Sequence, residues 1–154
     1  MKTKLTLGLL VTSASLTLLT SAPAQAEDWT LFANSGCRTT LGNTQTLVSG
    51  LKATGGSAVV SCPITKEVVA DAFINVYARI DRAVANGPDP FCVLNTVDID
   101  GEPQQSGYRF AQKVAGYQSL SLPKPTHYAS GYADIICTLN NNDMLHGIRY
   151  RQKN

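Results

Sequence analysis

The stretch "AFINVYARIDR", residues 72–82, decides the fold of this chain, because it fits both a strand and a helix. Side chains of a strand alternate between two faces. A strand would place Ile74, Val76, Ala78 and Ile80 on an apolar face, and Asn75, Tyr77, Arg79 and Asp81 on a polar one. A helix would instead align Val69, Phe73, Val76, Ile80 and Val84. Thr65 would cap that helix, and Gly87-Pro88 would end it. Periodicity alone favours the helix. Whether residues 65–85 include a helix is left open at this point.

The rest of the chain reads as short strands separated by turn signals. Residues 46–52, "TLVSGLK", and residues 57–64, "SAVVSCPI", flank "ATGGS", which predicts a pair of strands joined by a glycine turn. Further strand-like runs are "FCVLNTVDID" (91–100), "GYRFAQKV" (107–114), "YQSLSL" (117–122), "YADIICTL" (132–139) and "LHGIRYRQ" (145–152). The pattern is typical of an all-β domain.

Four cysteines, at Cys37, Cys62, Cys92 and Cys137, indicate two disulfides in an exported chain of this size. The sequence has no C-x-x-C pair and no histidine near the cysteines, which argues against zinc binding and thiol redox chemistry. Spacing alone leaves three pairings open. Ala58, Val60 and Cys62 share one strand face, and Pro63 follows directly.

Residues 1–26 have the features of a signal peptide. Lys2 and Lys4 precede a leucine-rich apolar segment, and Ala24-Gln25-Ala26 offers a cleavage site. We expect the remaining 27–154 to form a single domain that is secreted or periplasmic. No second apolar segment reaches membrane length, so we do not expect the chain to span a membrane.

The charge balance argues against a nucleic-acid partner. The whole chain has 13 basic and 11 acidic residues. Cleavage would remove Lys2 and Lys4, which leaves a net charge of zero. A neutral surface has no general field that attracts nucleic acid.

A resemblance decides the open questions. The chain resembles small exported bacterial β-sandwich proteins of unknown function in a series of landmarks: Cys37, "CPI" (62–64), "INVYARIDR" (74–82), "CVL" (92–94), "GYQSL" (116–120), "YADIICTL" (132–139) and "HGIRYR" (146–151). The resemblance implies an antiparallel β-sandwich, with jelly-roll or immunoglobulin-like strand order left open. It implies that 74–82 is a central strand, and that the disulfides are Cys37–Cys62 and Cys92–Cys137. Pro63 would then close its strand, where the missing N–H costs little. No activity is implied.

Candidate metal and catalytic groups are sparse. Asp98, Asp100 and Glu102 are weak calcium candidates, but the spacing fails the EF-hand pattern and favours an ordinary Asp-Gly turn. Residues 140–143, "NNND", also read as a turn. Neither His127 nor His146 has a partner at a recognised spacing, and the G-x-S-x-G and H-E-x-x-H motifs are missing from the sequence. We therefore expect no catalytic site, metal or cofactor.

Two groups of residues are candidates for ligand binding. Arg149, Arg151 and Lys153 alternate, so a final strand would present them on one face. We favour a charged sheet edge that prevents aggregation, and the other interpretation is a stripe that binds anionic glycan or lipopolysaccharide. Tyr108 and Phe110 would share a face, as would Tyr132 and Asp134, and exposed aromatic rings can stack on sugars.

These features predict an exported, non-enzymatic structural or binding module. Its candidate partner is a cell-surface glycan or a protein, and its ligand and oligomeric state stay open. The alternative is a small hydrolase or an enzyme inhibitor on the same scaffold. Exposed aromatic rings or a rigid loop would favour binding or inhibition, and a cleft joining a histidine to an acid and a nucleophile would favour catalysis.

Overall fold

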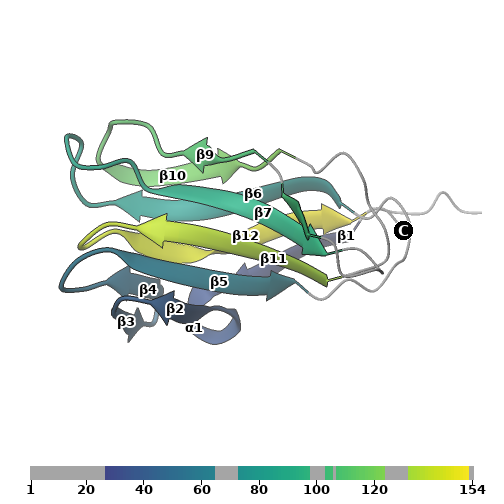
Figure 1. The fold of residues 1–154 in the computed structure, drawn as a ribbon, viewed down its shortest axis with the longest axis horizontal. Coiled ribbons are helices and arrows are strands. Elements are labelled where there is room, and N and C mark those ends of the chain that lie inside the picture. Colours follow the sequence, from purple (N-terminus) through teal and green to yellow (C-terminus); the bar gives the residue numbers. More distant parts are fainter. Residues whose placement is uncertain (1–26, 65–72, 98–102, 106, 124–131, 153–154) are drawn as a thin grey trace, which may run out of the picture.

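A computed structural model describes residues 27–64, 73–97, 103–105, 107–123 and 132–152 of the chain. Their strands form two sheets that face each other in a sandwich (Figure 1). All pairs of the described strands are antiparallel. The predicted antiparallel β-sandwich with two disulfides is therefore confirmed.

Sheet A has the order β10-β6-β12-β4-β3. β1 also pairs with β12, along residues 147–152, whereas β4 pairs with residues 144–145 of the same strand. The bounds of its strands are β1 (Glu27–Phe32), β3 (Thr44–Leu47), β4 (Gly50–Ala53), β6 (Phe73–Arg82), β10 (Gly116–Ser121) and β12 (Met144–Gln152). A helical turn, α1 (Ala33–Gly36), follows β1.

Sheet B has the order β2-β5-β11-β7-β8, and β9 pairs with β7 beside β8. The bounds of its strands are β2 (Arg38–Leu41), β5 (Ala58–Ile64), β7 (Phe91–Val97), β8 (Pro103–Gln105), β9 (Arg109–Phe110) and β11 (Tyr132–Leu139). Its central strands β5, β11 and β7 pack their inner face against β6 and β12 of sheet A, and these inner faces form the core.

The segment that decided the fold is a strand, as the resemblance implied. β6 lies between β10 and β12, and its side chains alternate as predicted. Val76, Ala78 and Ile80 are fully buried, whereas Tyr77 and Arg79 reach the outer surface. Residues 65–72 and the side chains of residues 73–74 lie outside the described part, so any helix there is untested.

Both disulfides implied by the resemblance are present. Cys37–Cys62 ties the segment after α1 to the inner face of β5, and Cys92–Cys137 joins directly opposite residues of β7 and β11. Ala58 and Val60 share the inner face of β5 with Cys62, as predicted. The expected role of Pro63 is wrong in one respect. β5 continues through Pro63 to Ile64, beyond the last residue that pairs with β2.

The prediction for residues 46–64 is partly wrong. The run 46–52 is not one strand but a hairpin of β3 and β4 that turns at Val48-Ser49. Position 50, the first residue of β4, requires glycine, because a Cβ there would collide with the carbonyl oxygen of Leu145 and because its φ is +152°. The glycine turn at 54–57 exists, but it carries the chain from sheet A to sheet B. β4 and β5 therefore do not pair.

The remaining strand predictions are close. The predicted strands 117–122, 132–139 and 145–152 correspond to β10, β11 and β12. β7 matches its prediction up to Val97, and only two residues of 107–114 form a strand, β9. Residues 140–143 make the predicted turn, with Asn142 in the left-handed region at a φ of 71°. Within the described ranges, no helix has the length and apolar character that crossing a bilayer requires.

Candidate ligand-binding site

The outer face of sheet A forms a grid of polar side chains, because the strand registers align them in rows. One row runs from Asn75 on β6 through Arg151 on β12 to Asp28 on β1. The next runs through Tyr77 and Arg149. The third runs from Ser119 on β10 through Arg79 and Gly147 to Phe32. Residues that are far apart in the sequence therefore share one surface, which we call the arginine face after Arg79, Arg149 and Arg151.

A β-bulge in β12 shapes this face. Leu145 pairs with Ile80 and Gly147 pairs with Arg79, so His146 is an extra residue without a partner on β6. Bulges redirect side chains, and they are frequent beside functional sites. Here the bulge places two consecutive residues, His146 and Gly147, on the outer face of sheet A.

Two shallow hollows lie on the arginine face, and Arg79 lines both. The first has a volume of about 300 Å³ and is lined by Asp28, Asn75, Tyr77, Arg79, Ser119, Arg149, Tyr150 and Arg151. The second has about the same volume, 300 Å³, and is lined by Thr30, Phe32, Val48, Ser49, Arg79, Tyr117, His146 and Gly147. Gly147 leaves its grid position without a side chain, and β1 passes so close that a Cβ would meet the carbonyl oxygen of Leu31.

The first hollow has an excess of positive charge. Asp28 is the one carboxylate among the described side chains that line it, and it lies 3.2 Å from Arg149 Nη2 and 3.8 Å from Arg151 Nε. Both arginines and the aspartate are half exposed, so these ion pairs contribute little to stability. Within the described residues, the side chain of Arg79 forms no ion pair and no hydrogen bond. Three guanidinium groups therefore face one carboxylate, with the Tyr77 ring beside them.

The second hollow has a histidine with a fixed tautomer. His146 Nδ1 lies 2.9 Å from the carbonyl oxygen of Ser49, and a carbonyl can only accept, so Nδ1 carries the proton. Nε2 is buried and has no hydrogen-bond partner in the described part of the chain. The Tyr117 ring lies 5.5 Å from the imidazole. Among the described residues that line this hollow there is no aspartate or glutamate that could orient His146 as the acid of a catalytic triad does.

The structure corrects one interpretation of the final strand. Arg149 and Arg151 share a face, as predicted, but β12 is an interior strand with β6 on one side and β1 and β4 on the other. The favoured interpretation, a charged sheet edge, is therefore wrong. It failed because alternation fixes the face of a side chain but not the position of its strand in the sheet. Lys153 lies outside the described residues.

Tyr108 and Phe110 belong to a separate aromatic cluster on sheet B. Their ring centroids are 6.5 Å apart, and Phe91 contacts both, at 5.4 Å from Tyr108 and 5.3 Å from Phe110. Phe110 is 57% exposed and Tyr108 is 49% exposed. This cluster belongs to the other sheet, because β9 pairs with β7 of sheet B.

The predicted pair Tyr132 and Asp134 is only partly described. Asp134 on β11 accepts a hydrogen bond of 2.7 Å from Ser61 Oγ, whereas the Tyr132 side chain lies outside the described part. Burial raises the pKa of the Asp134 carboxyl, and the hydrogen bond from Ser61 partly opposes this effect. The second carboxylate oxygen, Oδ1, is buried without a hydrogen-bond partner among the described residues.

The calcium candidates Asp98, Asp100 and Glu102 lie outside the described residues, as does His127. Within the described ranges, no group of three or more His, Cys, Asp or Glu side chains could hold a metal ion. The carboxylate of Asp143, in the predicted 140–143 turn, accepts hydrogen bonds from the backbone N–H groups of Ala83 and Asn140 at 2.8 and 2.9 Å. Both oxygens of the Asp143 carboxylate therefore already have hydrogen-bond partners within the protein.

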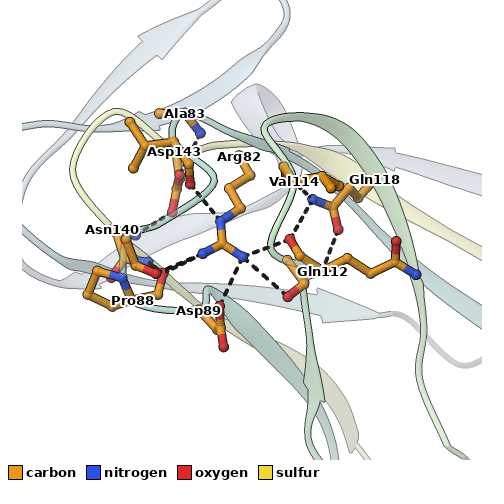
Figure 2. Close-up of polar contacts among 12 residues, drawn as sticks. Arg82, Ala83, Pro88, Asp89, Gln112, Val114, Gln118, Asn140 and Asp143 are labelled. Atoms are coloured by element: carbon orange, nitrogen blue, oxygen red, sulfur yellow. Dashed lines mark hydrogen bonds and ion pairs between the residues drawn. The ribbon is translucent and has the colours of Figure 1, made fainter.

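A second arginine on β6 was not predicted. Arg82 follows the inward-facing residues of the strand and is only 1% exposed. Its guanidinium donates to the carbonyl oxygens of Val84, Gly87 and Gln112 at 2.8, 2.8 and 2.7 Å. The same group lies 2.9 Å from Asp89 Oδ1 in an ion pair. Figure 2 shows the contacts of Arg82 with Gln112 and Asp89. Arg82 therefore joins the loop after β6 to the loop between β9 and β10.

Most of the arginine face was also missed at the sequence level. The strand alternation of 74–82 did place Asn75, Tyr77 and Arg79 together on one outer face. This alternation was visible in the sequence, but it did not indicate that residues 149 and 151 lie on a strand next to β6. No sequence pattern pointed to Asp28, Tyr117 or Ser119. Their strands, β1 and β10, join the arginine face only by pairing with distant parts of the chain.

No family model and no curated protein sequence matches the chain. Among solved structures, it is similar to one described as "Structural basis for the promiscuous specificity of the carbohydrate-binding modules from the beta-sandwich super family". The identity is 11%, the TM-score is 0.44, and the alignment covers 87% of this chain and 56% of the other. The chain thus spans little more than half the length of that structure. A likeness of this degree carries no information about a ligand of the present chain.

Proposed function

We propose that this protein is an exported, non-enzymatic binding module that recognises an acidic carbohydrate on the arginine face. The observation that carries the proposal is the charge of the first hollow, whose described lining combines Arg79, Arg149 and Arg151 with one carboxylate, Asp28. Guanidinium groups bind carboxylates and other planar or tetrahedral oxyanions through paired N–H donors.

The other residues of the face fit a sugar. Tyr77 lies in the first hollow and Tyr117 in the second, and an aromatic ring offers an apolar face to the C–H groups of a sugar ring. Asn75 and Ser119 add neutral hydrogen-bond donors and acceptors beside the arginines. The two hollows adjoin at Arg79, so a ligand of two or more sugar units could occupy both.

Arg79 is the expected centre of binding, since it lines both hollows and the described chain gives it no competing anion. Asp28 already neutralises part of the charge of Arg149 and Arg151. A ligand carboxylate would therefore gain most from Arg79, and a charge-assisted hydrogen bond to it is worth about 1.5–3 kcal/mol.

The test is calorimetry of the protein comprising residues 27–154 with oligogalacturonate, heparin-derived oligosaccharides and a neutral cello-oligosaccharide. We expect binding of an acidic oligosaccharide, which weakens as salt rises, and no binding of the neutral one. Arg79→Met should reduce the affinity about tenfold or more, in line with the loss of one charge-assisted contact. Lys113→Met, which removes an exposed cation outside both hollows, should leave it within about twofold.

Two results would contradict the proposal. Equal binding of acidic and neutral sugars would show that the guanidinium groups do not select the ligand. Equal loss of affinity in Arg79→Met and Lys113→Met would show that only the overall charge matters and that no site exists on this face.

A further inference from the structure

Among the described strands, β10 has a free edge. It lies at the end of sheet A and pairs with β6 alone in the described chain. The N–H of Leu122 donates to the carbonyl oxygen of Val76 at 2.9 Å, and antiparallel bonding pairs recur every two residues. Leu120 and Gln118 therefore bond to β6, whereas the N–H and C=O groups of Tyr117, Ser119 and Ser121 point away from it.

A side-chain contact confirms this direction. Arg109 Nε on β9 donates to the carbonyl oxygen of Ser121 at 3.0 Å, from the side opposite to β6. Within the described residues, the outward backbone groups of Tyr117 and Ser119 have no such partner. These two residues offer two N–H donors and two carbonyl acceptors along the edge.

A groove runs along this edge. Its volume is about 430 Å³, and we call it the edge groove; it is lined by Arg109, Phe110, Gln112, Val114 and the five consecutive residues 117–121. Side chains on one face of a strand would contribute only alternate residues, so a consecutive lining places the groove along the main chain. Five residues of a strand span about 17 Å.

The opposite wall of the groove is held rigidly. Gln118 accepts a hydrogen bond from the backbone N–H of Gln112 at 2.7 Å and donates to the carbonyl oxygens of Gln112 and Val114 at 3.1 and 2.7 Å. Arg82 also donates to the Gln112 carbonyl, so two side chains fix the loop 111–115 from inside, as Figure 2 shows. The groove therefore exists before any partner binds.

The edge lacks the usual protection against an added strand. Natural edge strands carry lysine, proline or inward-pointing charges that block pairing. Residues 116–121, "GYQSLS", contain no proline and no charged residue. Exposed apolar side chains line the groove instead, since Phe110, Val114 and Tyr117 are 57%, 53% and 58% exposed.

We propose that the edge groove binds an extended peptide segment of a partner protein, which adds to sheet A as a strand beside β10. The backbone groups of Tyr117 and Ser119 supply the main-chain hydrogen bonds. Alternate side chains of the peptide pack against Phe110 and Val114, so apolar residues at every second position are preferred. The positive charge of Arg109 disfavours lysine or arginine near Ser121.

A single strand fits this place better than a second copy of the chain. Strands pair at about 4.8 Å, so two whole sandwiches could pair only if their β10 edges met without obstruction. Here β9 and the loop 111–115 form a wall opposite β10, and Arg82 and Gln118 hold that wall in place. This inference rests on backbone geometry and does not depend on the acidic-carbohydrate proposal.

The test begins with a phage-displayed library of random eight-residue peptides, selected on the protein comprising residues 27–154. We expect enriched peptides with alternating apolar residues. In the complex, amide hydrogen exchange of Tyr117 and Ser119 should slow at least about tenfold, whereas Gln118 and Leu120, already bonded to β6, should change little. A synthetic copy of an enriched peptide with an N-methyl group on one pairing amide should bind about fivefold more weakly, or worse.

A variant of the protein tests the same bond from the other side. Ser119→Pro removes an N–H that points into the edge groove but spares the ladder with β6, so we expect at least about a tenfold loss of peptide affinity. Lys52→Met on β4, away from the groove, is the control that should bind normally. Should Ser119→Pro fail to fold, the N-methylated peptide decides alone.

Three results would overturn the proposal. The first is a library that yields no enriched peptide, and the second is an N-methylated peptide that binds as well as its parent. The third is protection of Tyr117 and Ser119 without peptide that grows with protein concentration, which would show that a second copy occupies the edge.

Discussion

Replacing Arg82 with methionine should remove the contact that holds two loops together. The guanidinium is buried, and its three short hydrogen bonds go to the carbonyls of Val84, Gly87 and Gln112. These carbonyls lie in loops that water can partly reach, so each lost bond costs about 1 kcal/mol rather than the full charged value. We expect Arg82→Met to lower the free energy of unfolding by about 3 kcal/mol.

Methionine is the suitable replacement because it keeps most of the buried aliphatic stem. Arg82→Lys should cost less, about 1–2 kcal/mol, since an ammonium group keeps the charge but cannot reach all three carbonyls at once. Asp89 is 30% exposed, so Asp89→Asn should cost less than about 1 kcal/mol despite the ion pair. Arg79→Met, the matched control on the outer face of the same strand, should change stability by less than about 0.5 kcal/mol.

Urea unfolding followed by far-UV circular dichroism, with both disulfides intact, measures these differences if the slope with urea stays constant. Amide exchange gives a local readout. The N–H groups of Ala111 and Gln112 are bonded to the Pro90 carbonyl and to Gln118, and they should exchange faster in Arg82→Met. A loss below about 1 kcal/mol, or an equal loss in Asp89→Asn, would refute the reasoning that the carbonyl contacts dominate.

Two further predictions concern the core and its surroundings. Burial raises the pKa of Asp134, so the folded state holds this proton more tightly than the unfolded state, and ionisation destabilises the fold as pH rises above the usual value of 3.8. Asp134→Asn should therefore raise the melting temperature at pH 7, and the gain should shrink as pH falls toward 4; a gain that does not depend on pH would contradict the assignment to charge. Replacing Cys92 and Cys137 together by alanine opens a 45-residue loop, and replacing Cys37 and Cys62 opens one of 25, so loop entropy predicts losses of about 4 and 3.5 kcal/mol. Urea unfolding of both double variants checks this, and losses that differ by more than about 2 kcal/mol would show that native packing, not loop length, sets the cost.

Local patterns in the sequence were sufficient for several features. The alternation of Val76, Ala78 and Ile80 with polar residues describes the faces of β6 correctly, because the period of a strand is a property of its own backbone. The turn signals at 54–57 and 140–143 mark real turns for the same reason. Periodicity did not by itself exclude a helix for this segment, and the strand was expected only through the resemblance.

Partners of a strand are a different matter, since no local period encodes them. The sequence correctly predicted that Arg149 and Arg151 share a face, but the neighbours of β12 are β6, β4 and β1, from distant parts of the chain. The same holds for the run 46–52, which forms a hairpin that turns at Val48-Ser49, with Gly50 packed against the backbone of Leu145. Pairing energy comes from contacts across the sheet, so only the assembled sheets decide which strand is interior.

The sequence by itself thus determined the strand faces, the main turns and the number of disulfides. The tertiary structure decided the arginine face, the edge groove and the environment of Arg82. The arginine face brings Asp28 beside Arg149, and Arg82 contacts Ala111 and Gln112, which follow it by 29 and 30 residues in the sequence. From the sequence alone, an arginine at the end of an apolar strand face is expected to be exposed to solvent. Only the loops that fold over Arg82 supply the carbonyl oxygens that make its burial favourable.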